Sequence, residues 1–372
     1  KIEAAGLRSY LAISGGLEAP DYLGSKSTFT LGRFGGHGGR ALLPGDVIGI
    51  SSSPVSSPQS SASIPYTRDW KVGVLYGPHG APDFFLDEDI TTFFATAWEV
   101  HYNSARTGVR LIGPKPKWAR TDGGEAGLHP SNLHDNAYAI GAVDFTGDMP
   151  VILGPDGPSL GGFVCPVVVV DAELWKLGQL RPGDKITFVP VTESWAENQT
   201  AAVGDFLSGK STSLPDPSEA SIGSPILDAF GEDDEKVVIR RAGDRYLLVE
   251  FGPHLLDLKL RFKAHVVYQW LREQSLKGII DLTPGIRSLQ IHFDSTVIAR
   301  DELRAIIRDG IAALPPLEQI EVPARVVHLP ISWDDPSTRE AIQRYMVGVN
   351  PKAPWCPSNL EFIRRINGLD SL

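Results

Sequence analysis

The side chains that could do chemistry gather in two polar stretches of the sequence. The first brings together basic, hydroxyl and amide side chains with a downstream carboxylate: Asn103, Arg106, Thr107, Gly108, Arg110, Glu125 and Asn136. The second runs from Asp156 through Ser159, Gly161 and Gly162 to Phe163, just ahead of an apolar run. A carboxylate and free backbone N–H groups at the mouth of a barrel can accept a proton and stabilise an oxyanion. A structural turn capped by Asp156 explains the second stretch equally well.

Other catalytic patterns are weaker. Neither Cys165 nor Cys356 has a plausible base beside it, so no covalent acyl nucleophile is evident. Residues 204–211 match the nucleotide-binding P-loop letter for letter, but polar residues precede them and prolines follow, which indicates a chance match. His129, His134 and Asp135 match no standard zinc spacing, and we predict polar loop residues with no metal site.

A glycine-dense loop at 32–40 leaves two interpretations open. Glycines permit positive φ angles and close backbone approach, so the loop could contact a ligand. A tight turn of a barrel requires the same residues.

Composition narrows the class of protein. The 372 residues carry a formal net charge of −10, so the basic surface needed to bind nucleic acid is absent. The two cysteines cannot form a disulfide framework, which favours a cytoplasmic setting. No apolar run approaches the roughly 18 residues of a membrane span. We therefore expect no membrane or nucleic-acid partner.

The elements that must position these residues follow from apolar patterning. Short apolar runs separated by Gly, Pro, Asn and Asp turns predict a barrel or sandwich over 1–192, with one helix over 89–96. The predicted strands are 7–13, 47–50, 70–75, 109–111, 138–143, 151–153, 164–170 and 186–191.

The rest of the chain changes character twice. Residues 193–235 are rich in Ser, Gly, Pro and acids without sustained periodicity, which predicts a flexible linker. Residues 236–319 read as strands, helix, strands, helix, a small α/β domain of the split-βαβ kind. Its first helix carries Leu260, Ala264, Val267 and Leu271 on one face. A strand-like stretch at 326–331 opens a further unit over 320–372 that does not finish, and both ends of the chain look cut from something longer.

Several of these stretches resemble the carboxyltransferase region of biotin-dependent urea carboxylase, as found in urea amidolyase. The matching residues are 6–16, 23–28, 38–42, 106–111, 129–135, 156–163 and 354–368. The resemblance covers nearly the whole chain except 193–235. The first half is shared more broadly, with subunits of bacterial 5-oxoprolinase and with the sporulation-kinase inhibitor and antagonist pair. The His-Pro-Ser-Asn run at 129–132 and the Trp-Cys-Pro-Ser-Asn run at 355–359 favour the urea enzyme.

The resemblance implies a fold and a division of the reaction steps between domains. The fold is mainly β with α+β: cyclophilin-like β-barrels in a first half, then a second half that begins with a small α/β domain. On this comparison the chain starts within the first half, and 320–372 is the incomplete start of a second barrel unit. Biotin would arrive on a separate carrier domain, with ATP and Mg²⁺ bound only on a separate biotin carboxylase domain. These two domains of the parent chain and urea are the implied partners.

The resemblance also implies roles for residues. The reaction would move CO2 from carboxybiotin to urea and form allophanate. Arg106, Arg110 and Asn136 would donate hydrogen bonds, and Asp156 or Glu125 would act as acceptor or base. Asn103, Thr107, Ser159, Gly161 and Gly162 would complete the binding surface. Two alternatives remain: a component of a 5-oxoprolinase-like enzyme, and a regulatory protein-binding module of the kinase-inhibitor type.

Overall fold

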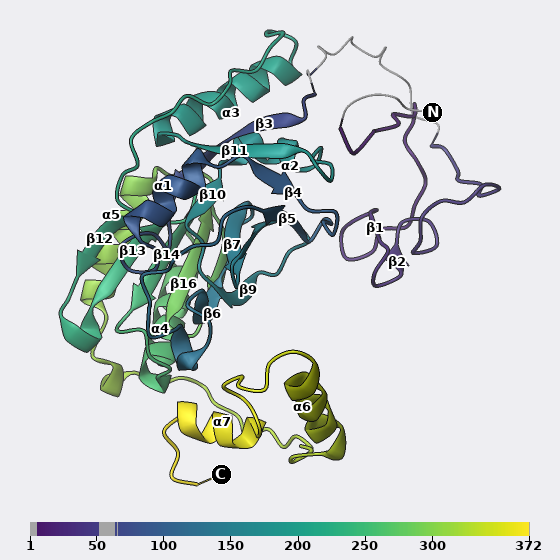
Figure 1. The fold of residues 1–372 in the computed structure, drawn as a ribbon. Helices are drawn as coiled ribbons and strands as arrows, with labels where there is room; N and C mark the ends of the chain where they lie inside the picture. The colour runs from purple at the N-terminus through teal and green to yellow at the C-terminus, as the bar shows by residue number, and fades with distance from the viewer. Residues whose placement is uncertain (1–5, 52–63, 65, 372) are drawn as a thin grey trace. The chain divides into compact units, whose positions relative to one another are not determined.

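The computed structural model describes residues 6–51, 64 and 66–371. Contacts divide the chain into two compact units: residues 7–64, and residues 1–6 together with 65–372 (Figure 1). No helix in the described ranges is long and apolar enough to cross a membrane.

The unit at 7–64 holds one short hairpin, of β1 (Thr28–Phe29) and β2 (Phe34–Gly35). Arg40 closes the following loop with two hydrogen bonds of 2.7 Å to the Asp46 carboxylate. The glycine-dense loop is a tight turn, because a Cβ at Gly39 would lie 2.3 Å from the carbonyl oxygen of Arg33. The strands predicted at 7–13 and 47–50 are wrong apart from one bridge at Ile50: among the described residues of this unit no strand pairs with them.

A closed seven-stranded barrel forms the centre of the larger unit and confirms the β-rich prediction (Figure 1). The strand order is β10 (Val167–Val169), β3 (Asp69–Tyr76), β11 (Lys185–Pro190), β4 (Trp98–Val100), β5 (Gly108–Ile112), β8 (Met149–Leu153), β7 (Ala142–Thr146), and β7 returns to β10. Aromatic rings fill the core, where Phe93 and Phe188 stack with centroids 5.0 Å apart. Phe93 comes from α1 (Asp87–Ala95), the helix predicted over 89–96. Short helical segments η1 (Glu125–Gly127), η2 (Asp171–Glu173) and α2 (Leu174–Leu177) lie in the connections.

A two-stranded ribbon lies outside the barrel sheet. It pairs β6 (Asn132–Ala137) with β9 (Leu160–Phe163) in antiparallel register. The strand predicted over 138–143 is wrong for 138–141, which connect β6, ending at Ala137, to β7, beginning at Ala142. The ribbon carries Asn136, Gly161 and Gly162, three of the six residues with predicted binding roles.

An α/β sandwich follows, as predicted for 236–319. The sheet order is β12 (Ile226–Phe230), β13 (Val237–Arg241), β14 (Tyr246–Phe251), β16 (Ser288–Phe293), β15 (Ile279–Pro284). Helices α4 (Leu258–Gln274) and α5 (Arg300–Ala313) pack on it, and all four residues of the predicted α4 face are buried. β16 lies between β14 and β15 and runs antiparallel to both, which is the split-βαβ arrangement.

The barrel and the α/β sheet share a buried contact. Tyr138 and Val168 from the barrel side pack in one apolar cluster with Tyr246 and Leu248 of β14. The Gln290 side-chain amide of β16 donates a 2.9 Å hydrogen bond to the Tyr138 carbonyl oxygen. The α/β domain therefore packs against the barrel near the β6–β9 ribbon.

The flexible linker predicted over 193–235 is wrong in two places. Helix α3 (Glu193–Leu207) begins at the N-cap Thr192, and β12 forms the edge of the α/β sheet. The 3-10 segment η3 (Asp233–Glu235) follows. The apolar pattern did not predict this helix because its buried face includes Gln199. The Gln199 amide donates to Glu173 Oε1 at 3.2 Å and so replaces an apolar contact. Residues 204–211 therefore begin within the last turn of a helix and do not follow the strand that a P-loop requires.

The described part of 320–371 contains no strand. After η4 (Leu317–Gln319) the stretch predicted as a strand at 326–331 has no regular secondary structure and pairs with no strand of the described residues. Helices α6 (Pro336–Gly348) and α7 (Asn359–Ile366) follow it, and the rings of Tyr345 and Trp355 pack 5.5 Å apart. The strand prediction fails here because a β-strand needs a partner for its backbone groups.

Candidate functional site

The β6–β9 ribbon places Asn136 opposite Gly161. A Cβ on Gly161 would lie 2.4 Å from the ring of Tyr138, and one on Gly162 would lie 2.8 Å from the Leu133 carbonyl oxygen. The glycines are therefore required by packing within the protein.

Asn136 and Ser159 hold the ribbon internally. The buried Asn136 side chain donates to the Ala137 carbonyl oxygen at 3.0 Å. The Ser159 carbonyl oxygen accepts from the Tyr138 N–H at 2.9 Å, and the Tyr138 hydroxyl accepts from the Phe163 N–H at 2.8 Å. Asn136 keeps its side-chain carbonyl oxygen as a further acceptor.

An exposed ion pair joins two of the predicted catalytic residues. Arg106 Nε lies 2.6 Å from Asp156 Oδ2, and their side chains are 55% and 25% exposed. The Thr107 carbonyl oxygen accepts from the Gly154 N–H at 3.5 Å, which holds the loop of Asp156 against the start of β5. Asn103 lies in the preceding exposed turn, where its N–H donates to His101 Nδ1. Asp156 therefore pairs with Arg106 across two loops in addition to lying in a turn.

Arg110 is aligned with a carboxylate that the sequence analysis missed. Arg110 on β5 and Asp144 on β7 both pair with Val151 of β8, so they lie on the same face of the barrel sheet. Asp144 is 3% exposed, Oδ2 accepts from the Thr146 hydroxyl at 3.1 Å, and Oδ1 has no hydrogen-bond partner among the residues that the structure describes. Burial raises the pKa of Asp144 to about 6, against the opposing effects of Thr146 and Arg110. A charged residue inside an apolar strand is the signal that could have identified it.

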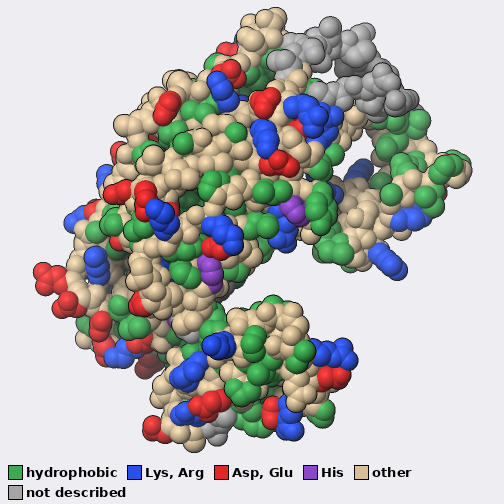
Figure 2. Space-filling view, viewed as in Figure 1, with side chains coloured by type: hydrophobic (Ala, Val, Ile, Leu, Met, Phe, Trp, Pro, Cys, Tyr) green, Lys and Arg blue, Asp and Glu red, His purple; other side chains and the backbone are tan. Residues whose placement is uncertain are grey.

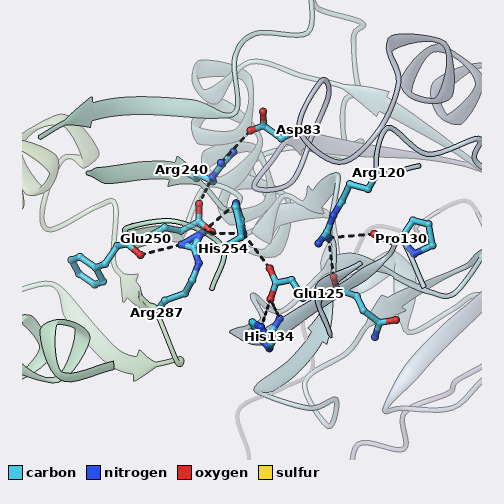
Figure 3. Close-up of polar contacts among 11 residues, drawn as sticks. Asp83, Arg120, Glu125, Pro130, His134, Arg240, Glu250, His254 and Arg287 are labelled. Atoms are coloured by element: carbon cyan, nitrogen blue, oxygen red, sulfur yellow. Dashed lines mark hydrogen bonds and ion pairs between the residues drawn. The ribbon is translucent and has the colours of Figure 1, made fainter. Parts of the chain in front are cut away.

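Glu125, also predicted as catalytic, lies in a buried charge network (Figure 3). Its Oε1 is 3.2 Å from His254 Nδ1, and its Oε2 accepts from the backbone N–H of His134. The His134 ring nitrogen Nε2 is 3.5 Å from the same oxygen. Burial favours a higher pKa for Glu125, but the hydrogen bonds from His254 and His134 outweigh it and lower the pKa. Glu125 therefore remains ionised and is a weak base.

The network continues into the α/β domain (Figure 3). Arg287 donates to His254 and, at 3.1 Å, to Glu250 Oε1. Arg240 donates to Glu250 Oε2 and lies 3.3 Å from Asp83 Oδ2. Burial alone would raise the pKa of Glu250, but the two guanidinium groups hold it far below its usual range. Opposite charges thus alternate along the row.

Phe84 lies at the centre of the network. His79 and His254 contact its ring edge-on, and the guanidinium carbons of Arg120 and Arg240 lie 5.6 and 5.8 Å from its centroid. Burial lowers the pKa of His79 to about 3, so this imidazole is neutral; its Nδ1 accepts from the Cys165 N–H. Arg120 also donates to the Asn132 carbonyl oxygen at 2.8 Å, which ties the ring cluster to the start of β6.

Sequence reasoning found one member of this network and missed the rest. His254, Arg287, Glu250 and Arg240 lie far along the chain from Glu125 and come near it only through the docking of two domains. Charges within the apolar strands at 237–241 and 246–251 were the available signal, since buried charges require partners.

The structure groups no metal ligands within its described ranges. His129 instead contacts Ser131 and lies 3.3 Å from Asp148 Oδ1. The side chain of Asp135 lies outside the described part of the chain. Side chains of both signs are spread over the face of the larger unit that Figure 2 shows.

Comparisons with known proteins match this architecture. The family "Carboxyltransferase domain, subdomain A and B" matches residues 1–190, and "Carboxyltransferase domain, subdomain C and D" matches 237–371. Urea amidolyase of Saccharomyces cerevisiae is 43% identical over 98% of this chain. The crystal structure of Kluyveromyces lactis urea carboxylase aligns with a TM-score of 0.85 at 42% identity over 98% of this chain and 34% of that chain. A 5-oxoprolinase subunit of Escherichia coli is 30% identical over 50% of this chain and 56% of its own length. The chain spans about a fifth of the yeast urea amidolyase, 21% of its length.

Proposed function

The chain belongs to the carboxyltransferase domain family, and from this premise we propose that it is the carboxyltransferase part of a biotin-dependent urea carboxylase, a ligase that forms allophanate from urea. The observation that carries the proposal is coverage. Similarity to urea amidolyase and urea carboxylase runs through both halves and the connecting segment, whereas similarity to the bacterial 5-oxoprolinase subunit extends over half of the chain.

The described residues fit a carboxylated urea-type ring. Such a group carries a carboxylate and a carbonyl oxygen, which both require hydrogen-bond donors. The exposed guanidinium of Arg106 and that of Arg110, a half-buried residue on the same sheet face as Asp144, would supply these donors. Biotin, on a separate carrier domain of the same polypeptide, would deliver the carboxyl group as CO2. ATP and Mg²⁺ would act on a separate biotin carboxylase domain.

Asp156 would act on the urea substrate. Urea is neutral and offers N–H donors and one carbonyl acceptor, so its site needs an acceptor facing a donor. A C–N bond forms between a urea nitrogen and the carbon of CO2, and this attack makes the nitrogen acidic. Asp156 would accept that proton, and Arg106 would hold the Asp156 carboxylate in place. Asn136 and Arg110 would bind oxygen atoms of the reactants. Glu125 would support the site from within its network.

Thr107, Asn103, Ser159, Gly161 and Gly162 would shape the binding surface through the backbone contacts described above. We further place the enzyme in the cytoplasm, supported by cysteines that are free among the described residues.

The test uses the natural polypeptide that contains this chain with its other domains. Urea-dependent ATP hydrolysis is measured with and without avidin for the wild type, Asp156→Asn and Arg106→Ala. We expect avidin to abolish the urea-dependent rate, and each substitution to lower it by on the order of 100-fold. Lys210→Ala is the control, because this exposed lysine pairs with Asp205 at the end of α3 and should leave the rate unchanged. Activity indifferent to avidin would remove biotin from the account, and full activity in both variants would remove Asp156 and Arg106 from the site.

A further inference from the structure

The loop between β14 and α4 carries a histidine that contacts the barrel. We propose that His254 is a positioning residue: it acts through Glu125 to fix strand β6 and with it Asn136. This inference rests on the proposed function only in assigning Asn136 to substrate binding. The coupling of His254 to β6 is a property of the fold and can be measured without turnover.

The link from His254 to β6 has two steps. Glu125 Oε1 is 3.2 Å from His254 Nδ1, and Glu125 Oε2 accepts from the His134 N–H. His134 is two residues before Asn136 on the same strand, within the stretch from Asn132 to Asn136 where the register against β9 shifts. The carboxylate thus joins a loop of the α/β domain to the strand that carries the substrate-binding amide (Figure 3).

Arg287 and Glu125 both contact the imidazole of His254. Arg287 Nη2 lies 3.1 Å from Nδ1 and 3.3 Å from Nε2 of the ring. The carboxylate of Glu125 accepts only, so its 3.2 Å contact with Nδ1 requires a proton on Nδ1.

The imidazole is held on its other sides as well. Arg287 is itself fixed by Glu250 Oε1 at 3.1 Å and by the Phe251 carbonyl oxygen at 3.4 Å. The ring of Phe84 meets the imidazole edge-on at 5.5 Å. The His254 side chain, which is 39% exposed, therefore has partners on three sides, and we expect its position to determine where Glu125 and the His134 N–H are placed.

Removal of the imidazole leaves a buried carboxylate short of one donor. Glu125 would then move toward other donors, and the His134 N–H would lose its fixed acceptor. Because Asn136 binds substrate and does not transfer the proton, the urea KM should rise by on the order of 10- to 100-fold. The kcat at saturating urea should stay within about threefold of the wild type.

The experiment compares His254→Ala, His254→Asn and the wild type in the natural polypeptide. An asparagine amide can reach the position of Nδ1 and donate to Glu125, so it should rescue part of the effect. The control is His265→Ala, a half-buried histidine of α4 that contacts Gln269 on its own helix. Hydrogen exchange of the peptide that covers 132–137 is measured beside the urea KM and kcat.

Faster exchange at 132–137 and a raised urea KM in His254→Ala, with intermediate values in His254→Asn and wild-type values in His265→Ala, support the proposal. Unchanged exchange or unchanged KM in His254→Ala overturns it, as does faster exchange spread evenly over the whole polypeptide. A wild type without urea-dependent turnover would refute the proposed function instead. The exchange comparison then still decides whether His254 fixes β6.

Discussion

Two clusters of charge lie near the β6–β9 ribbon, and they are built in opposite ways. Arg106 and Asp156 form one pair at the surface, where solvent and ions screen the attraction. The row from Glu125 through His254, Arg287 and Glu250 is mostly buried, and each charge has at least one charged or hydrogen-bonding neighbour. An exposed pair can open to meet a substrate with little loss of free energy, whereas removing a member of a buried row is strongly destabilising. The contrast assigns chemistry to the first cluster and support to the second.

The largest effect on stability is expected from the substitution of Glu250. Glu250→Ala leaves the buried guanidinium groups of Arg240 and Arg287 without their shared carboxylate. We expect the free energy of unfolding to fall by about 3–5 kcal/mol. Guanidinium chloride is the denaturant of choice, since urea is the proposed substrate. Glu361→Ala, at an exposed pair with Arg364, is the control, and a loss at Glu250 no larger than at Glu361 would contradict the buried-row account.

Asp144 should make stability depend on pH. Its pKa is raised from 3.8 to about 6, so the folded state prefers the protonated acid. The resulting stabilisation is fully present below about pH 4 and is lost as the pH rises through about 6; a pKa raised by about two corresponds to about 3 kcal/mol. The asparagine of Asp144→Asn cannot titrate. The unfolding free energy of this variant should therefore rise relative to that of the wild type between about pH 4 and about pH 8. Parallel pH curves for the two proteins would show that Asp144 has an ordinary pKa.

Gly161 should tolerate no side chain. Gly161→Ala places a Cβ against the Tyr138 ring, and this overpacking should cost about 1–3 kcal/mol of unfolding free energy. Gly209→Ala is the comparison variant, because no atom of the described residues lies within 4 Å of a Cβ at Gly209. Gly209 has a positive φ, so its substitution strains the backbone alone, whereas substitution of Gly161 creates a steric contact. A smaller loss at Gly161 than at Gly209 would contradict the packing role.

Arg106 should matter least to the fold. Arg106→Ala should change the unfolding free energy by less than about 1 kcal/mol, because its partner Asp156 remains solvated. Thermal unfolding of the same preparation used for activity gives the measurement. A loss comparable to that of Glu250→Ala would erase the distinction between the two clusters.

Helices and strands could be predicted from the sequence wherever the local apolar spacing was enough to specify them. The α4 face at Leu260, Ala264, Val267 and Leu271 and the barrel strands were readable because their apolar spacing matches one period. The helix α3 was not, since Gln199 occupies its buried face through a hydrogen bond that hydropathy does not register.

The site was predictable only in part for a related reason. Arg106, Asp156 and Glu125 were selected as polar residues near turns, and the first two do meet. The partner of Glu125 is His254, which is 129 residues away and is brought near by domain docking. Asp144 lies just after the strand predicted over 138–143, and its environment depends on burial that spacing alone does not reveal.

The central claim is that this chain transfers a carboxyl group to urea at the exposed cluster. The most direct measurement is the conversion of isotopically labelled bicarbonate into allophanate by the natural polypeptide, for the wild type, Asp156→Asn and Lys210→Ala. We expect urea-dependent label in allophanate from the wild type and Lys210→Ala, its loss with avidin, and a loss on the order of 100-fold in Asp156→Asn without a change in unfolding. Allophanate formed at the wild-type rate by Asp156→Asn, or formed in the presence of avidin, would contradict it.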